Sequence, residues 1–180
     1  MRTLTLLRHA KSGWDDPVLR DFDRPLNGKG LRAAVAVGRN LRSIGLEFDH
    51  VVASPAARVV ETLAGVGEGY GDDLAPAWDR RIYLASPATL FDVIHELPDG
   101  AGRVLLAGHN PGLEELVLAL VPDLKDDALR DRVEAKFPTG SIAVLEFAVD
   151  RWADVRAAGG SLTRFVRPRD LDPALGPDQN

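Results

Sequence analysis

Three short apolar runs along the chain have the composition of buried β-strands. They comprise residues 4–7, 51–53 and 104–107, and each run ends at polar residues. Continuous aliphatic runs of this length are typical of strands that are covered on both faces, as in parallel sheets. Stretches with apolar residues at helical spacing separate the runs, so strand and helix alternate. This alternation predicts an α/β fold with three layers, in which helices cover both faces of a mainly parallel central sheet.

The helices between these strands are expected to begin at residues that commonly cap helix N-termini. The first predicted helix has about four turns of apolar residues at helical spacing and ends near Gly45. The second is expected to run only to about residue 63, because residues 65–73 are rich in glycine and acidic residues and indicate a loop. The residues predicted to start helices are Asn27, Ser54, Ser86 and Asn110, and the last three precede proline.

The C-terminal part of the chain has a different pattern. Residues 141–149 are rich in strand-forming residues, residues 152–155 are expected to pair with them as a hairpin, and residues 162–166 are a weaker strand candidate. Residues 168–180 are rich in proline and aspartate and contain few apolar residues, which predicts a poorly ordered tail. The folded domain is therefore expected to comprise residues 1–167.

The composition is that of a soluble globular protein and excludes several classes of function. The chain has 180 residues, of which 45% are hydrophobic and 27% charged. It has no cysteine, so disulfides, zinc–thiolate sites and cysteine nucleophiles are excluded. The net charge of −5 argues against a nucleic-acid surface. Neither a membrane-spanning apolar run nor a secretory signal is visible, so we expect a cytoplasmic protein without a membrane partner.

Arginine and histidine side chains follow the three predicted strands. Arg8 and His9 come directly after the first strand, Arg58 follows the second, and His109 follows the third. The carboxyl ends of parallel strands share one edge of a sheet, so these side chains are expected to converge. Arginines grip phosphate oxygens in a bidentate manner and lower the pKa of a neighbouring histidine, which favours its nucleophilic neutral form. A single such residue is usually an exposed surface residue, and it is the convergence that predicts an anion site.

Two other clusters carry less functional meaning. The acidic residues between the first strand and the first helix lack the spacing and the terminal glutamate of a calcium loop, and they indicate a solvated acidic loop. Residues 28–30 (Gly-Lys-Gly) lack the remaining residues of a nucleotide P-loop. The acidic residues of this loop are Asp15, Asp16, Asp21 and Asp23. Because they lack the pattern of a calcium loop, no metal site is predicted.

Four segments of the chain carry a family resemblance. They are residues 6–14, 24–30, 54–62 and 108–112. In this order they resemble the motifs of the histidine phosphatase superfamily, and most closely those of the small bacterial phosphohistidine phosphatases of the SixA type. The resemblance extends from about residue 3 to residue 147 and implies a phosphoglycerate mutase-like fold.

The resemblance also implies a mechanism without metal or cofactor. His9 is expected to attack phosphorus and form a phosphohistidine intermediate, which water then hydrolyses. Arg8, Arg58 and a protonated His109 are expected to hold the phosphoryl oxygens. Asn110 is expected to add a backbone N–H to this phosphate site.

Two departures from the mutases of the superfamily bear on the substrate. Residues 79–83 contain no glutamate to protonate a leaving alcohol, and Asp15 stands where the mutases have asparagine. An imidazole leaving group needs less help from an acid than an alkoxide does, so a phosphohistidine-bearing protein is the expected substrate. Two alternatives stay open. One is a phosphatase of small phosphate esters or sugar phosphates that uses Asp16, Asp79 or water as acid, and the other is a non-catalytic phosphate-binding module. The sequence does not specify the oligomeric state.

Overall fold

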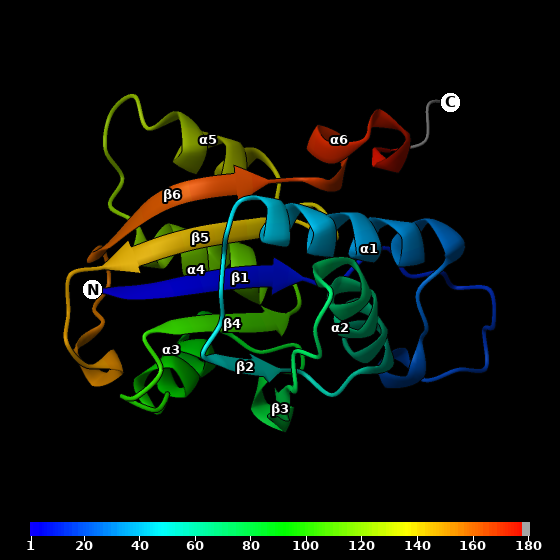
Figure 1. The fold of residues 1–180 in the computed structure, drawn as a ribbon, viewed down its shortest axis with the longest axis horizontal. Helices are drawn as coiled ribbons and strands as arrows, with labels where there is room; N and C mark the ends of the chain where they lie inside the picture. The colour runs from blue at the N-terminus through cyan, green and yellow to red at the C-terminus, as the bar shows by residue number, and fades with distance from the viewer. Residues whose placement is uncertain (178–180) are drawn as a thin grey trace.

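A mixed sheet of six strands forms the centre of the computed structural model, which describes residues 1–177 (Figure 1). The strands are β1 (Arg2–Arg8), β2 (His50–Ala53), β3 (Ala77–Trp78), β4 (Arg103–Gly108), β5 (Ile142–Phe147) and β6 (Gly160–Val166). The helices are α1 (Gly28–Ser43), α2 (Ala57–Tyr70), α3 (Pro87–His95), α4 (Gly112–Leu120), α5 (Ala128–Ala135) and α6 (Pro168–Leu171).

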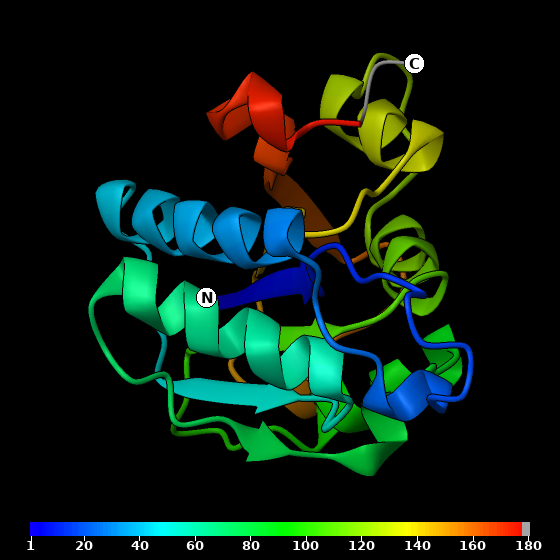
Figure 2. The same ribbon diagram turned by 90° about the vertical axis from the view of Figure 1, so that its right-hand side faces the viewer.

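The strand order is β3-β2-β4-β1-β5-β6. The pairs β3–β2, β2–β4 and β4–β1 are parallel, whereas β1–β5 and β5–β6 are antiparallel. Helices α1 and α2 cover one face of the sheet, and α3, α4 and α5 cover the other (Figure 2). The predicted three-layer α/β fold with a mainly parallel sheet is confirmed.

The central strands consist of unbroken runs of apolar residues because both of their faces are buried. Side chains alternate between the two faces of a strand, so Leu4 and Leu6 of β1 join the core beneath α3 and α4, while Leu7 joins the core beneath α1 and α2. In β4, Leu106 and Leu105 divide between the two cores in the same way. This burial holds the central strands rigidly and fixes the position of the residues that follow them.

The second helix is longer than its sequence predicted, and the predicted loop at residues 65–73 is wrong for its first six residues, because α2 continues to Tyr70. Glycines in both α1 and α2 allow the two helices to pack with their backbones in close approach. A Cβ atom on Gly65 would lie 2.7 Å from the Cβ of Ala34, and one on Gly38 would lie 2.1 Å from the carbonyl oxygen of Val66. The glycines are therefore needed for helix packing here, although their local propensity disfavours a helix.

The hairpin partner of β5 also differs from the prediction. Trp152–Asp154 forms a short 3-10 helix (η3) instead of a strand, and β6 pairs with β5 in its place. The indole of Trp152 is fully buried and donates a hydrogen bond of 2.7 Å to the carbonyl oxygen of Ala101. The side chain of Trp152 is thus part of the hydrophobic core beneath α3 and α4. Helix α5 was not predicted.

The segment after β6 is ordered as far as the structure describes it, which corrects the expectation of a poorly ordered tail from residue 168. Helix α6 and a 3-10 turn (η4, Pro173–Leu175) lie against α1. The carboxylate of Asp170 accepts a hydrogen bond of 2.9 Å from the backbone N–H of Arg167 and caps α6. The predicted domain boundary at residue 167 therefore does not separate a fold from a tail. Residues 178–180 of the predicted tail lie outside the described residues.

Within residues 1–177, the helices are too short or too polar to cross a membrane. The cytoplasmic location stays a prediction.

Candidate active site

The carboxyl ends of β1, β4 and β2 lie next to one another because these strands are parallel neighbours in the sheet. The backbone N–H of His9 donates a hydrogen bond of 3.1 Å to Gly108, and the N–H of Ser54 donates one of 3.1 Å to Ala107. These bonds extend the ladder by one residue past the strands and place the side chains that follow around one cleft. The cleft measures about 350 Å³ and is lined by Arg8, His9, Lys11, Ser12, Trp14, Asp21, Arg24, Arg58, Leu84, His109, Asn110 and Thr139.

His9 is held in a form suited to nucleophilic attack. Its Nδ1 lies 2.7 Å from the carbonyl oxygen of Ala10. A carbonyl can only accept a hydrogen bond, so Nδ1 carries the proton and Nε2 keeps its lone pair. Burial, and to a lesser degree the nearby charge of Arg8, lowers the pKa of His9 to about 3. The imidazole is therefore neutral at physiological pH.

His109 lies beside His9, with 5.4 Å between the ring centroids. Its Nε2 is 2.8 Å from the hydroxyl of Ser54, and its buried Nδ1 has no hydrogen-bond partner among the described residues. Burial and the charge of Arg58 lower the pKa of His109 to about 3. His109 is therefore neutral at physiological pH, which differs from the expected protonated form. A neutral imidazole can still donate one N–H to a phosphate oxygen.

Arg8 projects from the end of β1, where the backbone fixes one end of its guanidinium. Its Nη1 donates a hydrogen bond of 3.0 Å to the carbonyl oxygen of Phe137, while its buried Nε has no partner among the described residues. The carboxamide of Asn110 donates a hydrogen bond of 2.9 Å to the same carbonyl. The side chain of Asn110 therefore anchors this side of the cleft. Its predicted contribution, a backbone N–H to phosphate, stays a prediction.

Arg58 lies in the first turn of α2 and is almost fully buried, with 2% of its surface exposed. Asp21, in a 3-10 turn (η1, Asp21–Asp23), accepts hydrogen bonds from both ends of its guanidinium. Nη1 donates to the backbone oxygen at 2.8 Å and Nη2 donates to the carboxylate at 3.0 Å. These two bonds set the direction in which the arginine faces the cleft.

Asp21 lines the cleft and contacts Arg58, but the sequence did not identify it as a candidate site residue. Its carboxylate also accepts hydrogen bonds from Arg24, at 3.1 Å, and from the hydroxyl of Tyr83. Burial acts to raise the pKa of Asp21, but the bonds from Tyr83 and Arg58 outweigh it and lower the pKa to about 2. The prediction of a solvated acidic loop is wrong for Asp21. Asp21 lies six residues before Asn27, the nearest predicted helix start, and this position gave no signal that it would contact Arg58.

The other candidate acids lie elsewhere. Neither Asp16 nor Asp79 lines the cleft, and Asp79 instead pairs with Arg81 at 2.8 Å. Trp14 does line the cleft, and the guanidinium of Arg24 lies 3.7 Å from the centroid of its ring. No group of three or more His, Asp or Glu residues suited to a metal ion occurs within residues 1–177. The cleft thus combines a neutral histidine with two fixed guanidinium groups, a set that is suited to phosphoryl transfer.

The two buried histidines predict an acid-sensitive fold. Their folded pKa of about 3 lies below the ordinary value of 6.5, so the unfolded chain binds more protons between these pH values. The free energy of unfolding is therefore expected to fall as pH decreases from 6.5, with a limiting slope of about 1.4 kcal/mol per pH unit for each histidine. Carboxylates with a lowered pKa, such as that of Asp21, change the free energy of unfolding only below about pH 4. Urea unfolding between pH 4.5 and 7.5 measures this slope. We expect a shallower slope in the His9→Gln/His109→Gln double variant, and equal slopes would contradict the assignment.

Comparisons with known proteins identify the family of the chain. Residues 4–81 match the family model of the histidine phosphatase superfamily (branch 1). An uncharacterised Mycobacterium tuberculosis protein is 37% identical over 164 residues, which cover 91% of this chain and all of that relative. An uncharacterised chloroplastic protein of Arabidopsis thaliana is 48% identical over 169 residues, which cover 88% of this chain and 72% of that protein.

Solved structures extend the match over nearly the whole chain. The SixA-type protein of Nakamurella multipartitia is 33% identical, with a TM-score of 0.81 over 93% of this chain and 96% of that chain. The protein histidine phosphatase SixA complexed with tungstate has a TM-score of 0.76 over 94% of this chain and 99% of that chain, but only 20% identity, so it shows the shared fold alone. The sheet is phosphoglycerate mutase-like, and the chain belongs to the histidine phosphatase superfamily as a phosphatase of the SixA type.

Proposed function

We propose that this phosphatase removes the phosphoryl group from phosphohistidine on a protein, through a phosphohistidine intermediate on His9. One observation carries the choice of substrate. Among the described residues that line the cleft, Asp21 is the only one with a carboxyl group, and its pKa of about 2 keeps it ionised. The cleft therefore has no carboxylic acid able to protonate a leaving alkoxide. Phosphohistidine needs none, because its imidazole takes up a proton near neutral pH.

In the first step, Nε2 of His9 forms a bond to phosphorus while the P–N bond of the substrate breaks. The substrate histidine leaves as neutral imidazole, with the proton that its ring has taken from water. Arg8 and Arg58 hold the phosphoryl oxygens and stabilise the charge of the transition state. In the second step, a water molecule forms a bond to phosphorus, the bond to His9 breaks, and a proton of that water passes to solvent. Inorganic phosphate leaves, and His9 is again neutral.

The Ala10 carbonyl supports the assignment of His9 as the nucleophile. By accepting a hydrogen bond from Nδ1–H, with 2.7 Å between Nδ1 and the oxygen, it fixes the tautomer in which Nε2 is the attacking atom. The lowered pKa keeps that nitrogen unprotonated. The tungstate complex of SixA shows that the related protein binds a tetrahedral oxyanion, and the arginines near His9 are suited to the same kind of ligand.

The retained alternative is a phosphatase of small phosphate esters. Structures with the same fold include a mycobacterial glucosyl-3-phosphoglycerate phosphatase, at 16% identity. To separate the two functions, phosphate release is measured in EDTA from a phosphohistidine peptide and from a panel of phosphoserine, sugar phosphate and phosphoglycerate substrates. We expect the highest kcat/KM for phosphohistidine. A higher value for an ester would reject this substrate, and no turnover of any substrate would favour a binding module.

A further inference from the structure

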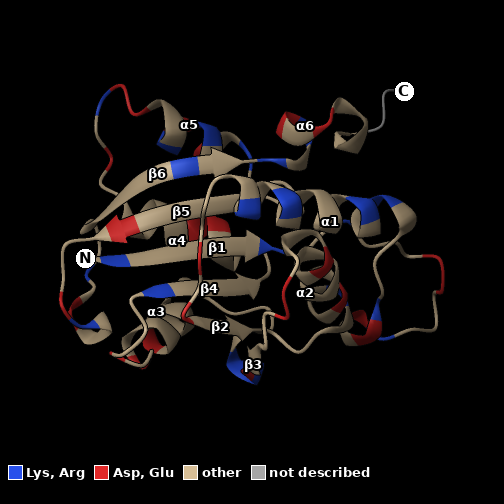
Figure 3. Cartoon of the chain, in the orientation of Figure 1, with Lys and Arg blue, Asp and Glu red and all other residues tan. Residues whose placement is uncertain are grey.

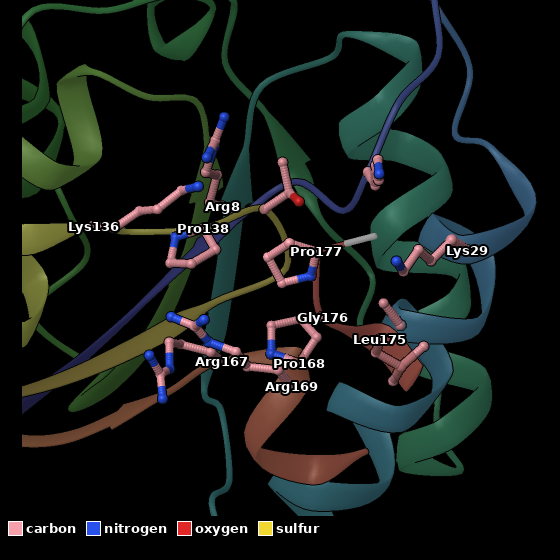
Figure 4. A pocket seen from close by; sticks show the side chains of 13 residues that line it. Arg8, Lys29, Lys136, Pro138, Arg167, Pro168, Arg169, Leu175, Gly176 and Pro177 are labelled. Carbon is pink, nitrogen blue, oxygen red and sulfur yellow. The ribbon is translucent and has the colours of Figure 1, made fainter. Parts of the chain in front are cut away.

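A second cleft lies beside the candidate active site and is lined by basic residues (Figure 4). It measures about 350 Å³, and its lining contains no Asp or Glu among the described residues. The basic residues that line it are Arg8, Lys11, Lys29, Lys136, Arg167 and Arg169. Since the chain as a whole has a net charge of −5, this is a local concentration of positive charge on an acidic protein.

The fold builds this cleft from the C-terminal segment. Helix α6 and η4 lie against α1, and Arg169 of α6 lines the same cleft as Lys136, which follows α5. Figure 3 shows basic residues on α1 and at the end of β6, next to α6. Arg167 is paired with Asp170 at 2.7 Å. Within the described part of the chain, the exposed side chains of Lys136 and Arg169 form no ion pair, and their charges are available to a ligand.

The two clefts are continuous. Arg8, Lys11 and Thr139 line both of them. The second cleft is therefore within reach of a molecule whose phosphoryl group lies at His9. Apolar surface also lines the cleft, contributed by the partly exposed side chains of Pro138 and Leu175. An occupant that combines negative charges with apolar groups fits this arrangement.

We infer that this cleft binds an acidic segment of the protein substrate, next to the phosphorylated histidine in sequence. Carboxylates of the segment pair with Lys136 and Arg169, and an apolar side chain packs on Pro138 and Leu175. An extended chain advances about 3.3–3.6 Å per residue, so acidic residues within a few positions of the phosphohistidine reach the cleft. This inference rests on the proposed function and adds a sequence preference to it. The favoured substrate is acidic around the modified histidine.

The test uses two peptides with a central histidine, flanked on both sides by Leu and either Glu or Gln. Binding of the unphosphorylated peptides to the full chain is measured by fluorescence anisotropy. We expect the Glu peptide to bind about tenfold more tightly than the Gln peptide at low salt, since two screened charge pairs are involved. The Lys136→Gln/Arg169→Gln variant is expected to lose this difference. The matched control, Arg39→Gln/Arg164→Gln, removes two exposed charges outside the cleft. This variant is expected to keep the difference in affinity between the two peptides.

Three results would overturn the inference. These are equal affinity for the two peptides, an equal loss in the control variant, and tighter binding of inorganic pyrophosphate than of the Glu peptide, which would assign the cleft to a small substrate. The phosphorylated peptides test the proposed function separately. If neither phosphorylated peptide is hydrolysed while the Glu preference in binding persists, the phosphohistidine function fails and the cleft assignment stands.

Discussion

Replacement of His9 by alanine is expected to lower kcat/KM by about 10³-fold to 10⁶-fold, since loss of a nucleophile removes the covalent route altogether. The fold should tolerate the change, because His9 contributes an uncharged ring at the end of β1 and its backbone bonds to Gly108 and Gly140 remain. The residual rate would come from the arginines alone. Steady-state hydrolysis of a phosphohistidine peptide by wild type and variant measures the loss.

The matched control is His50→Ala, at the start of β2, which lies at the opposite end of that strand from the cleft. It should keep the wild-type rate. A quenched-flow experiment adds a direct readout, because the wild-type chain should carry acid-labile, alkali-stable phosphate during turnover and the His9 variant should not. Most of the activity surviving in His9→Ala, or a labelled protein in that variant, would assign the nucleophile to another residue.

The sequence predicted the central sheet and the convergence of the candidate residues on one cleft, because both depend on local patterns. A strand buried on both faces has to be apolar throughout, so β1, β2 and β4 stand out in the chain. Their shared direction then places Arg8, His9 and His109 at one edge of the sheet. Sequence reasoning needed no knowledge of side-chain contacts to reach this result.

Asp21 shows where such reasoning ends. It lies in a loop that is rich in aspartate, and nothing in its neighbours separates it from Asp15, Asp16 or Asp23. Its contacts with Arg58 and Tyr83 join residues 37 and 62 positions apart. A loop has no period from which such a contact follows, so only the three-dimensional path of the loop identifies Asp21.

The errors at α2 and α6 have a different cause. In both segments tertiary packing overrides local propensity. Gly65 and Gly69 disfavour a helix in isolation, but they let α2 approach the backbone of α1. Helix α6 starts at the buried Pro168 and lies against α1, although the segment is too polar to form a core of its own. This packing brings Arg167, Arg169 and Leu175 to the second cleft.

The contact between Asp21 and Arg58 leads to the second large effect. Replacement of Arg58 by lysine is expected to lower kcat/KM by about 10²-fold to 10³-fold, the usual cost of removing one donor to transition-state charge. Lysine keeps the positive charge, but it cannot bond to Asp21 through two nitrogen atoms and face phosphate with the rest of a planar group. The effect should appear mainly in kcat, because charge that develops in the transition state loses its partner.

Two comparisons separate this role from general structural damage. Arg39→Lys, an exposed arginine of α1 outside the cleft, should leave the kinetics unchanged. Asp21→Asn keeps the shape of the side chain but removes the charge that orients Arg58, so it should lower kcat by a smaller factor, about tenfold. Urea unfolding of each variant reports any loss of stability. If Arg58→Lys retains the wild-type kcat, or if its loss in rate only parallels a loss in stability, then Arg58 supports the fold and takes no part in phosphoryl transfer.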